Sequence, residues 1–136
     1  MPTLPLPFDR NQILELTQDF PTPFYIYDEK AIRANARRLI SAFGWCSNFR
    51  NHFAVKATPN PHLLEILADE GFGADCSSLP EILLAQSVGI DGEKIMFTSN
   101  DTPVSEFVYA KDAGAVLNLD DITHIQSVET HAGLPA

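Results

Sequence analysis

The sequence has few cysteines, few basic residues and no long apolar run, and each shortage excludes a class of protein. Two cysteines, Cys46 and Cys76, give neither a disulfide framework nor a paired spacing for a metal, so no metal site is expected. Nine Lys and Arg against 18 Asp and Glu give a net charge of -9, which argues against a nucleic-acid surface. No apolar run approaches the roughly 20 residues that span a bilayer, and the proline-rich start is unlike a signal peptide. We therefore expect no membrane partner and a cytoplasmic location.

The composition is that of a folded domain. The 136 residues are 45% hydrophobic and 20% charged, which is typical of a globular protein of one domain. After Gly44, strand-like apolar runs centre near Val55, Ala74, Met96 and Leu117, about 20 residues apart. A segment of helical character follows each run, at 61–70, 79–88, 103–112 and 121–129. The alternation predicts about four parallel βα units and an α/β fold.

Residues typical of helix boundaries support this division. The signals for helix starts are Asn60-Pro61, Thr102-Pro103 and the capping-box spacing Ser78-x-x-Glu81, and those for helix ends are Gly71, Gly89 and Gly114. Four βα units are half of a (β/α)8 barrel, whose complete form takes about 250 residues. An open doubly wound sheet is the other parallel arrangement, but no Gly-x-Gly-x-x-Gly follows any predicted strand. The sequence therefore favours a partial barrel.

The start of the chain is predicted to be separate from these units. Residues 1–21 are proline-rich, with a short amphipathic piece around Ile13 and Leu16, and are expected to form an N-terminal arm. Residues 22–136 are the expected barrel part. Within them Phe24 to Tyr27 is predicted to be a strand, and Asp28 is placed to cap the helix that follows.

One lysine interrupts the first of the four apolar runs. Lys56 lies in Phe53-Ala54-Val55-Lys56-Ala57, so we expect it near the carboxyl end of a buried strand. An unpaired ammonium is costly to bury, and such a group tends to lose its proton. A neutral amine at the mouth of a parallel sheet suits imine chemistry with a carbonyl compound or with pyridoxal phosphate. The alternative is a strand-end lysine whose amine reaches solvent.

A second segment extends this pattern and carries a resemblance. The spacing Gly-x-Gly-x-Asp-x-x-Ser-x-x-Glu runs from Gly71 to Glu81. With the lysine run, it resembles the fold-type III pyridoxal-phosphate decarboxylases, which include the diaminopimelate, ornithine and arginine decarboxylases. The segments Thr22 to Asp28 and Ala57-Thr58-Pro59-Asn60-Pro61 most resemble diaminopimelate decarboxylase. The resemblance runs from about Phe20 to about Val128, which is the N-terminal third or so of a typical member.

The resemblance implies a fold and an activity for a longer protein. It implies an alanine-racemase-like (β/α)8 TIM barrel that binds pyridoxal 5'-phosphate through Lys56, with the strand at 24–27 joining a C-terminal β domain. It implies a homodimer that decarboxylates meso-2,6-diaminopimelate to L-lysine and carbon dioxide. The family's phosphate loop and substrate-binding groups lie beyond these 136 residues, so we expect this chain alone to be inactive.

Two other residues are candidates for the cofactor site. Asp75 is expected at the same strand-end level as Lys56 one unit later, where its carboxylate would stabilise the charged or imine form of the lysine. Capping of a loop is the alternative role. Ala54 shares a barrel face with Lys56, and its small side chain leaves room for a cofactor ring, although small residues are also ordinary barrel packing.

The remaining polar residues near the strand ends have structural interpretations. Ser78 and Glu81 are interpreted as a capping box rather than as ligands. The polar residues 98–101, which end the third predicted strand, could line the mouth of a site, and capping of the next helix explains Asp101 or Thr102 equally well.

Two alternatives to diaminopimelate decarboxylase stay open at the level of sequence. One is another amino-acid decarboxylase of the same fold, of the ornithine, arginine or carboxynorspermidine type. Thr58 stands where the family more often has Asn, and Leu79-Pro80 replaces a glycine-rich pair. Neither departure touches Lys56, so they affect the choice of subfamily more than the expected lysine chemistry. The other alternative is a non-catalytic half-barrel that binds a partner.

Overall fold

We describe a computed structural model in which residues 6–134 are placed. The six α-helices are α1 (Arg10–Asp19), α2 (Glu29–Ala42), α3 (Pro61–Asp69), α4 (Leu79–Ser87), α5 (Val104–Asp112) and α6 (Thr123–His131). The four strands are β1 (His52–Ala54), β2 (Gly73–Cys76), β3 (Ile95–Ser99) and β4 (Val116–Leu119). Short 3-10 turns cover Val55–Ala57 and Gly92–Lys94. Within residues 6–134, no helix combines the length and apolar character needed to cross a bilayer.

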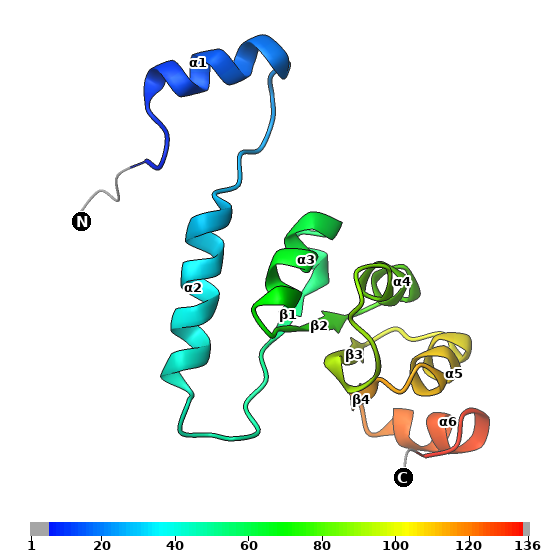
Figure 1. Cartoon of the computed structure of the whole chain (residues 1–136). Helices are drawn as coiled ribbons and strands as arrows, with labels where there is room; N and C mark the ends of the chain where they lie inside the picture. The colour runs from blue at the N-terminus through cyan, green and yellow to red at the C-terminus, as the bar shows by residue number, and fades with distance from the viewer. Residues whose placement is uncertain (1–5, 135–136) are drawn as a thin grey trace.

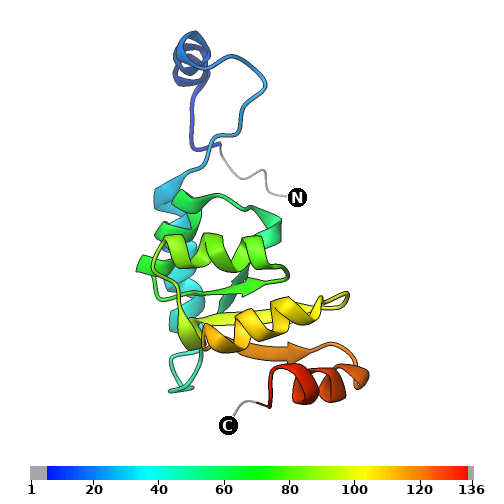
Figure 2. The same cartoon turned by 90° about the vertical axis from the view of Figure 1, so that its right-hand side faces the viewer.

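The four strands form one parallel sheet in the order β1-β2-β3-β4. A helix follows each strand, and these helices, α3 to α6, lie together on one side of the sheet (Figures 1 and 2). The prediction of four parallel βα units is confirmed, with helix boundaries that differ from the predicted ones by two residues or fewer. The number of units is half that of a closed (β/α)8 barrel.

The predicted boundary residues act largely as expected. The side chain of Asp28 accepts a hydrogen bond from the backbone N–H of Ala31 at 3.0 Å, and that of Asn60 accepts one from His62 at 3.0 Å. These bonds satisfy backbone donors that have no partner inside the helix. Gly71 and Gly89 follow α3 and α4 with φ of 87° and 80°, a backbone conformation that favours glycine.

The core lies between the sheet and its layer of helices. Ala74, Cys76, Ile95 and Phe97 point from the strands into this layer and are fully or almost fully buried. Phe97 meets Phe107 of α5 edge to face, with ring centroids 6.1 Å apart. Burial of each large apolar side chain contributes about 1.5–3 kcal/mol, so this face holds the sheet and the helices together.

The opposite face of the sheet is not covered by any helix in the described residues. Ala54, Asp75, Met96 and Val116 lie side by side on this face, because each is the register partner of the next. They are half-buried, apart from Val116, which is 41% exposed. Parallel sheets normally bury both faces, and in a closed barrel this face would be the interior.

Helix α2 lies outside the sheet and packs against α3. Ala36 of α2 joins Leu67 and Phe72 in a small second apolar cluster. The guanidinium groups of Arg33 and Arg37 bind the carboxylate of Glu70 at 3.1 and 2.7 Å, and the side chain of Glu70 is only 8% exposed. This ion-pair cluster links α2 to the end of α3.

Residues 24–27, at the start of the expected barrel part, have no hydrogen-bonded strand partner within residues 6–134. The predicted partner of this segment is a C-terminal β domain, so the strand at 24–27 stays a prediction. The amphipathic piece is the helix α1, which starts at a capping box between Asp9 and Gln12 and buries none of its residues. It projects away from the sheet and its helices (Figure 1). Residues 1–5 of the predicted arm, and residues 135–136, lie outside the described residues.

Candidate functional site

The candidate residues gather where the parallel strands end. Because all four strands run in one direction, their carboxyl ends meet at a single edge of the sheet, which is where barrel sites form. Asp75 is the register partner of Ala54, and Lys56 follows Ala54 by two residues. Ala54 and Asp75 therefore lie side by side on neighbouring strands at this edge, and Lys56 lies in the segment directly after β1.

Lys56 is placed differently from the expectation in its detail. Strand β1 ends at Ala54, and Lys56 lies in the 3-10 turn that follows. Val55 enters the core and is completely buried, which turns the next side chain outward, so that Lys56 is exposed. The expectation of a lysine buried inside a strand is wrong. The amine instead stands free at the mouth of the sheet, and it is not ion-paired with Asp75 in the described residues.

Asp75 has one carboxylate oxygen without a partner. Its Oδ1 is buried and accepts no hydrogen bond from the described residues. A buried oxygen in this state costs free energy that a structural residue normally avoids. Capping of a loop, the alternative considered for Asp75, would have given this oxygen a donor. The Oδ1 atom of Asp75 is therefore free to accept a hydrogen bond from a ligand or from another side chain of the site.

The loop after β2 is held by a contact that the sequence did not predict. Glu81 accepts hydrogen bonds from the backbone N–H of Ser77 at 2.7 Å and from its hydroxyl at 3.2 Å. Ser78 precedes α4 but its side chain makes no capping bond, so the predicted Ser78–Glu81 capping box is wrong. Glu81 lies in the first turn of α4, and its carboxylate reaches back to Ser77, the residue before the cap position. There it accepts hydrogen bonds from two donors, the backbone N–H and the hydroxyl of Ser77. The contact fixes the chain immediately after Asp75.

Of the polar residues at the end of β3, only some make side-chain hydrogen bonds within the described residues. The Asn118 side-chain amide donates to the hydroxyl of Thr98 at 3.2 Å, which links the ends of β4 and β3. Ser99 is buried. Neither Asp101 nor Thr102 caps α5, whose first cap position is Pro103, and the hydroxyl of Thr102 is buried without a partner among the described residues.

Cys76 adds no reactive group to this edge. Burial, together with the nearby carboxylates of Glu81 and Asp75, raises the pKa of its thiol to about 12. A thiol in this state is not a nucleophile at neutral pH. In the described part of the chain, no three His, Cys, Asp or Glu side chains come together as a metal centre would require.

Comparisons with known proteins agree with this geometry. The family described as pyridoxal-dependent decarboxylase, pyridoxal binding domain, matches residues 29–134. The chain belongs to this family. Pyridoxal phosphate is accordingly its cofactor, and the fold is part of the family's pyridoxal-phosphate-binding barrel.

Relatives of this decarboxylase domain carry several names. The protein TabA of Pseudomonas amygdali pv. tabaci is 48% identical over 114 residues, which are 84% of this chain and 27% of TabA. A diaminopimelate decarboxylase of Methanothermobacter thermautotrophicus is 40% identical over 108 residues, 79% of this chain and 25% of that protein. The chain thus spans about a quarter of the length of these curated relatives.

Solved structures give the same assignment. Diaminopimelate decarboxylase from M. jannaschii in complex with L-lysine superposes with a TM-score of 0.83 at 29% identity, over 88% of this chain and 29% of that one. Ornithine decarboxylase from Entamoeba histolytica superposes with a TM-score of 0.76 at 28% identity, over 88% and 38%. The half-barrel of the decarboxylase domain is therefore a recurring part of larger enzymes.

The residues at the strand ends fit the cofactor of the family. Lys56 offers an exposed primary amine, which can react with the aldehyde of pyridoxal phosphate. Asp75 offers a buried carboxylate oxygen without a partner, which can bind a charged group, and the small side chain of Ala54 leaves room for the ring. Lys56, Asp75 and Ala54 are the described residues that could hold it.

Proposed function

We propose that Lys56 is the residue that binds pyridoxal phosphate covalently, and that the whole protein decarboxylates meso-2,6-diaminopimelate to L-lysine and carbon dioxide. The observation that carries the proposal is that Lys56, in the turn directly after β1, and Asp75, near the end of the neighbouring parallel strand β2, lie at the same carboxyl-end edge of the sheet. The names of several relatives, and the L-lysine in the M. jannaschii structure, support the substrate. We further propose that the whole protein is a cytoplasmic homodimer.

The residues of this chain would divide the work between binding and proton transfer. When bound, pyridoxal phosphate supplies the electron sink that decarboxylation needs. The Asp75 carboxylate would hold a positively charged group of the cofactor or substrate at this edge in place, because opposite charges attract. The Lys56 amine can then hold a proton close to the reacting carbon and return it after carbon dioxide has left. Ala54 keeps the space beside the amine open.

Another amino-acid decarboxylase activity is the second candidate. The superposition on ornithine decarboxylase favours it, as does a 34% identical relative named L-glutamyl-[BtrI acyl-carrier protein] decarboxylase from Niallia circulans. The two candidates share Lys56 and its neighbours and differ in the substrate's side chain.

The test is an assay of carbon dioxide release by the whole protein with diaminopimelate, ornithine, arginine and lysine as substrates. We expect turnover of diaminopimelate, loss of turnover in Lys56→Arg, and unchanged turnover in Lys94→Arg, because Lys94 lies just before β3, at the end of the strands opposite to Lys56. Turnover of another amino acid would select the second candidate. Normal rates in Lys56→Arg would refute the role of Lys56, and absence of turnover with all four substrates would favour a non-catalytic half-barrel.

We also propose that the 136-residue chain alone has no decarboxylase activity, because catalysis needs the reacting group held in one geometry by more contacts than these strands offer. Release of carbon dioxide from diaminopimelate by the purified chain, abolished in Lys56→Ala, would overturn this.

A further inference from the structure

Glu81 binds the loop that connects β2 to α4. It lies in the first turn of α4, and its carboxylate accepts hydrogen bonds from the backbone N–H of Ser77 at 2.7 Å and from the hydroxyl of Ser77 at 3.2 Å. Hydrogen bonds to a charged acceptor are roughly twice as strong as those between neutral groups. Both residues are half-buried, so water competes less with these bonds than it would on an exposed surface. The chain is therefore held firmly at Ser77.

Ser77 follows Asp75 by two residues, and the core holds the chain between them. Ala74 and Cys76, on either side of Asp75, are completely buried beneath the helices. The Asp75 carboxylate points to the other face of the sheet, because side chains alternate along a strand. Its Oδ1 atom is buried and accepts no hydrogen bond from the described residues. The position of this carboxylate is therefore set by the backbone of β2, which the core fixes at Cys76 and Glu81 fixes at Ser77.

The start of α4 is also anchored to the part of the chain that carries Lys56. Ile82, the residue after Glu81, is completely buried in the same core cluster as Val55. Val55 directly precedes Lys56 in the turn after β1. The first turn of α4 is therefore fixed relative to Lys56, and the bonds from Ser77 to Glu81 fix the end of β2 to the same turn.

The place of Glu81 in its helix does not by itself explain this contact. Acidic residues are favoured in the first turn of any helix, because the helix dipole is positive there. Glu106 is likewise the third residue of its helix, α5, one unit later, and the start of α5 makes no side-chain capping bond within the described residues. An acidic residue at this place therefore needs no bond to the preceding loop, and the contact of Glu81 with Ser77 calls for a further explanation.

We propose that Glu81 is a positioning residue for the pyridoxal-phosphate site. By holding Ser77, it keeps the end of β2, and with it the Asp75 carboxylate, in the position from which Asp75 binds a positively charged group of the cofactor. This role rests on the proposed function only in that Asp75 binds the cofactor, and it is the same for each of the candidate substrates. It gives Glu81 an influence on cofactor affinity that a helix cap would not have.

The test is the affinity of the whole protein for pyridoxal phosphate, measured by titrating the cofactor into cofactor-free protein and following the absorbance of the bound form. Glu81→Ala removes the acceptor for both Ser77 donors, and we expect the dissociation constant to rise at least about tenfold. Glu81→Gln keeps an amide oxygen that accepts from the Ser77 N–H, so its dissociation constant should stay within about threefold of the wild type. Glu106→Ala is the matched control and should leave the affinity unchanged.

A double variant tests whether Glu81 acts through Asp75. Asp75→Asn alone should weaken cofactor binding, and adding Glu81→Ala should then raise the dissociation constant by less than about threefold, because the group that Glu81 positions has already lost its charge. Circular dichroism and urea unfolding check that each variant is folded under the conditions of the titration.

Three results would each overturn the role of Glu81: wild-type affinity in Glu81→Ala, binding by Glu81→Gln as weak as that by Glu81→Ala, or a further loss of about tenfold in the double variant. At saturating cofactor, Glu81→Ala should still carry the borohydride-reduced cofactor on Lys56. Absence of that adduct from Lys56 in the wild type would count against the proposed function instead, so the two failures are distinguishable.

Discussion

Gly73 offers a sharp test of the packing that sets the site. It is the first residue of β2, pairs with His52 in the register and lies two residues before Asp75. A Cβ atom at Gly73 would lie 2.6 Å from Cδ2 of His52 and would also collide with the backbone carbonyl oxygen of Lys94. Its φ is not positive, so alanine can adopt the same backbone, and any loss of stability comes from these contacts.

The size of the effect follows from what has to move. Overpacking of a filled site typically costs 1–3 kcal/mol, and a collision with backbone puts Gly73→Ala at the upper end, at about 3 kcal/mol. For a domain of this size such a loss lowers the melting temperature by about 10 °C. The Asp75 carboxylate would be displaced with the strand, so the edge that carries Lys56 would change as well.

Urea unfolding followed by circular dichroism measures the loss. Gly44→Ala is the matched control, because Gly44 also has no positive φ and its nearest atom would be the Ser41 carbonyl oxygen at 3.3 Å. That variant should stay within about 0.5 kcal/mol of the wild type. Equal stability of Gly73→Ala and wild type would refute the close packing of β1, β2 and the start of β3.

Two further predictions concern ionisable residues. Hydrogen bonds from Arg37 and then Arg33 lower the pKa of Glu70, so its contribution to stability is complete above the unfolded pKa of roughly 4.3 and is lost as the pH falls through the folded pKa. The difference in unfolding free energy between wild type and Glu70→Gln should therefore shrink between about pH 5 and about pH 3, and a constant difference would contradict the ion-pair cluster. Asp75→Ala should stabilise the chain without cofactor by about 1 kcal/mol, because it removes a buried oxygen without a partner. The exposed Asp101→Ala is its control, and a loss of stability in Asp75→Ala would indicate a structural role instead.

Local sequence patterns were enough to predict most of the fold. The apolar runs near Ala74 and Met96 are interrupted by polar segments, and Gly71 and Gly89 end the helices between them, so each unit is delimited by its own residues. The level of Asp75 at the strand end follows from the same regular spacing. Because neighbouring units repeat one geometry, a register of parallel strands could be inferred without knowledge of distant contacts.

The details that failed depend on contacts between distant residues. The run Phe53 to Ala57 is compatible with one long strand, but Val55 is buried in the core together with Leu64 and Ile82, and the chain turns there. Glu81 binds Ser77 and not Ser78, the residue with the capping-box spacing. Sequence spacing alone does not distinguish between these two neighbouring serines.

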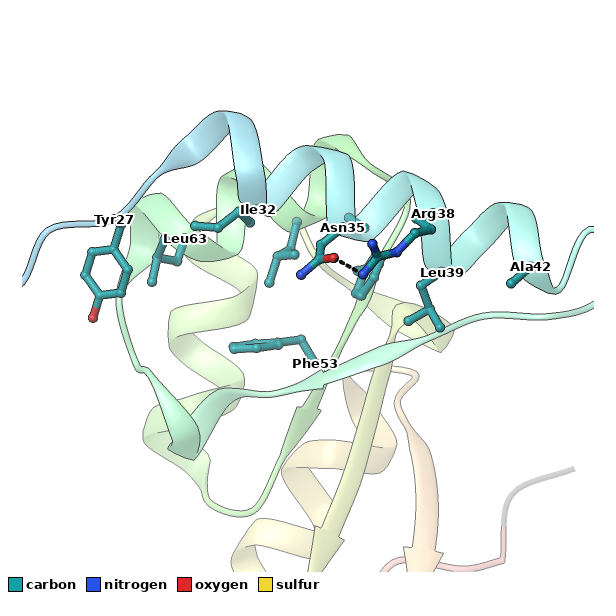
Figure 3. Close-up of a pocket in the computed structure, with 11 residues that line it drawn as sticks. Tyr27, Ile32, Asn35, Arg38, Leu39, Ala42, Phe53 and Leu63 are labelled. Carbon is teal, nitrogen blue, oxygen red and sulfur yellow. Dashed lines mark hydrogen bonds between the residues drawn. The ribbon is translucent and has the colours of Figure 1, made fainter. Parts of the chain in front are cut away.

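An apolar groove beside β1, lined by Leu39 of α2 and Phe53 of β1 among others (Figure 3), could not have been located from the sequence. It is bounded by α2, and α2 is positioned by the bonds of its Arg33 and Arg37 to Glu70 at the end of α3, more than 30 residues further along. The periodicity of α2 predicts an apolar stripe, but not which surface that stripe faces or whether the surface is filled.

The most direct test of the central proposal is to reduce the protein, loaded with pyridoxal phosphate, with borohydride and to map the modified peptide by mass spectrometry. We predict that the cofactor is fixed to the peptide containing Phe53 to Ala57, and that Lys56→Arg, with unchanged circular dichroism, removes the modification. Lys30, Lys94 and Lys111 are internal controls, and the amine of Lys111 already donates a hydrogen bond to the Ala132 carbonyl oxygen. An adduct on one of these three lysines, or one spread evenly over all four, would contradict the assignment of Lys56.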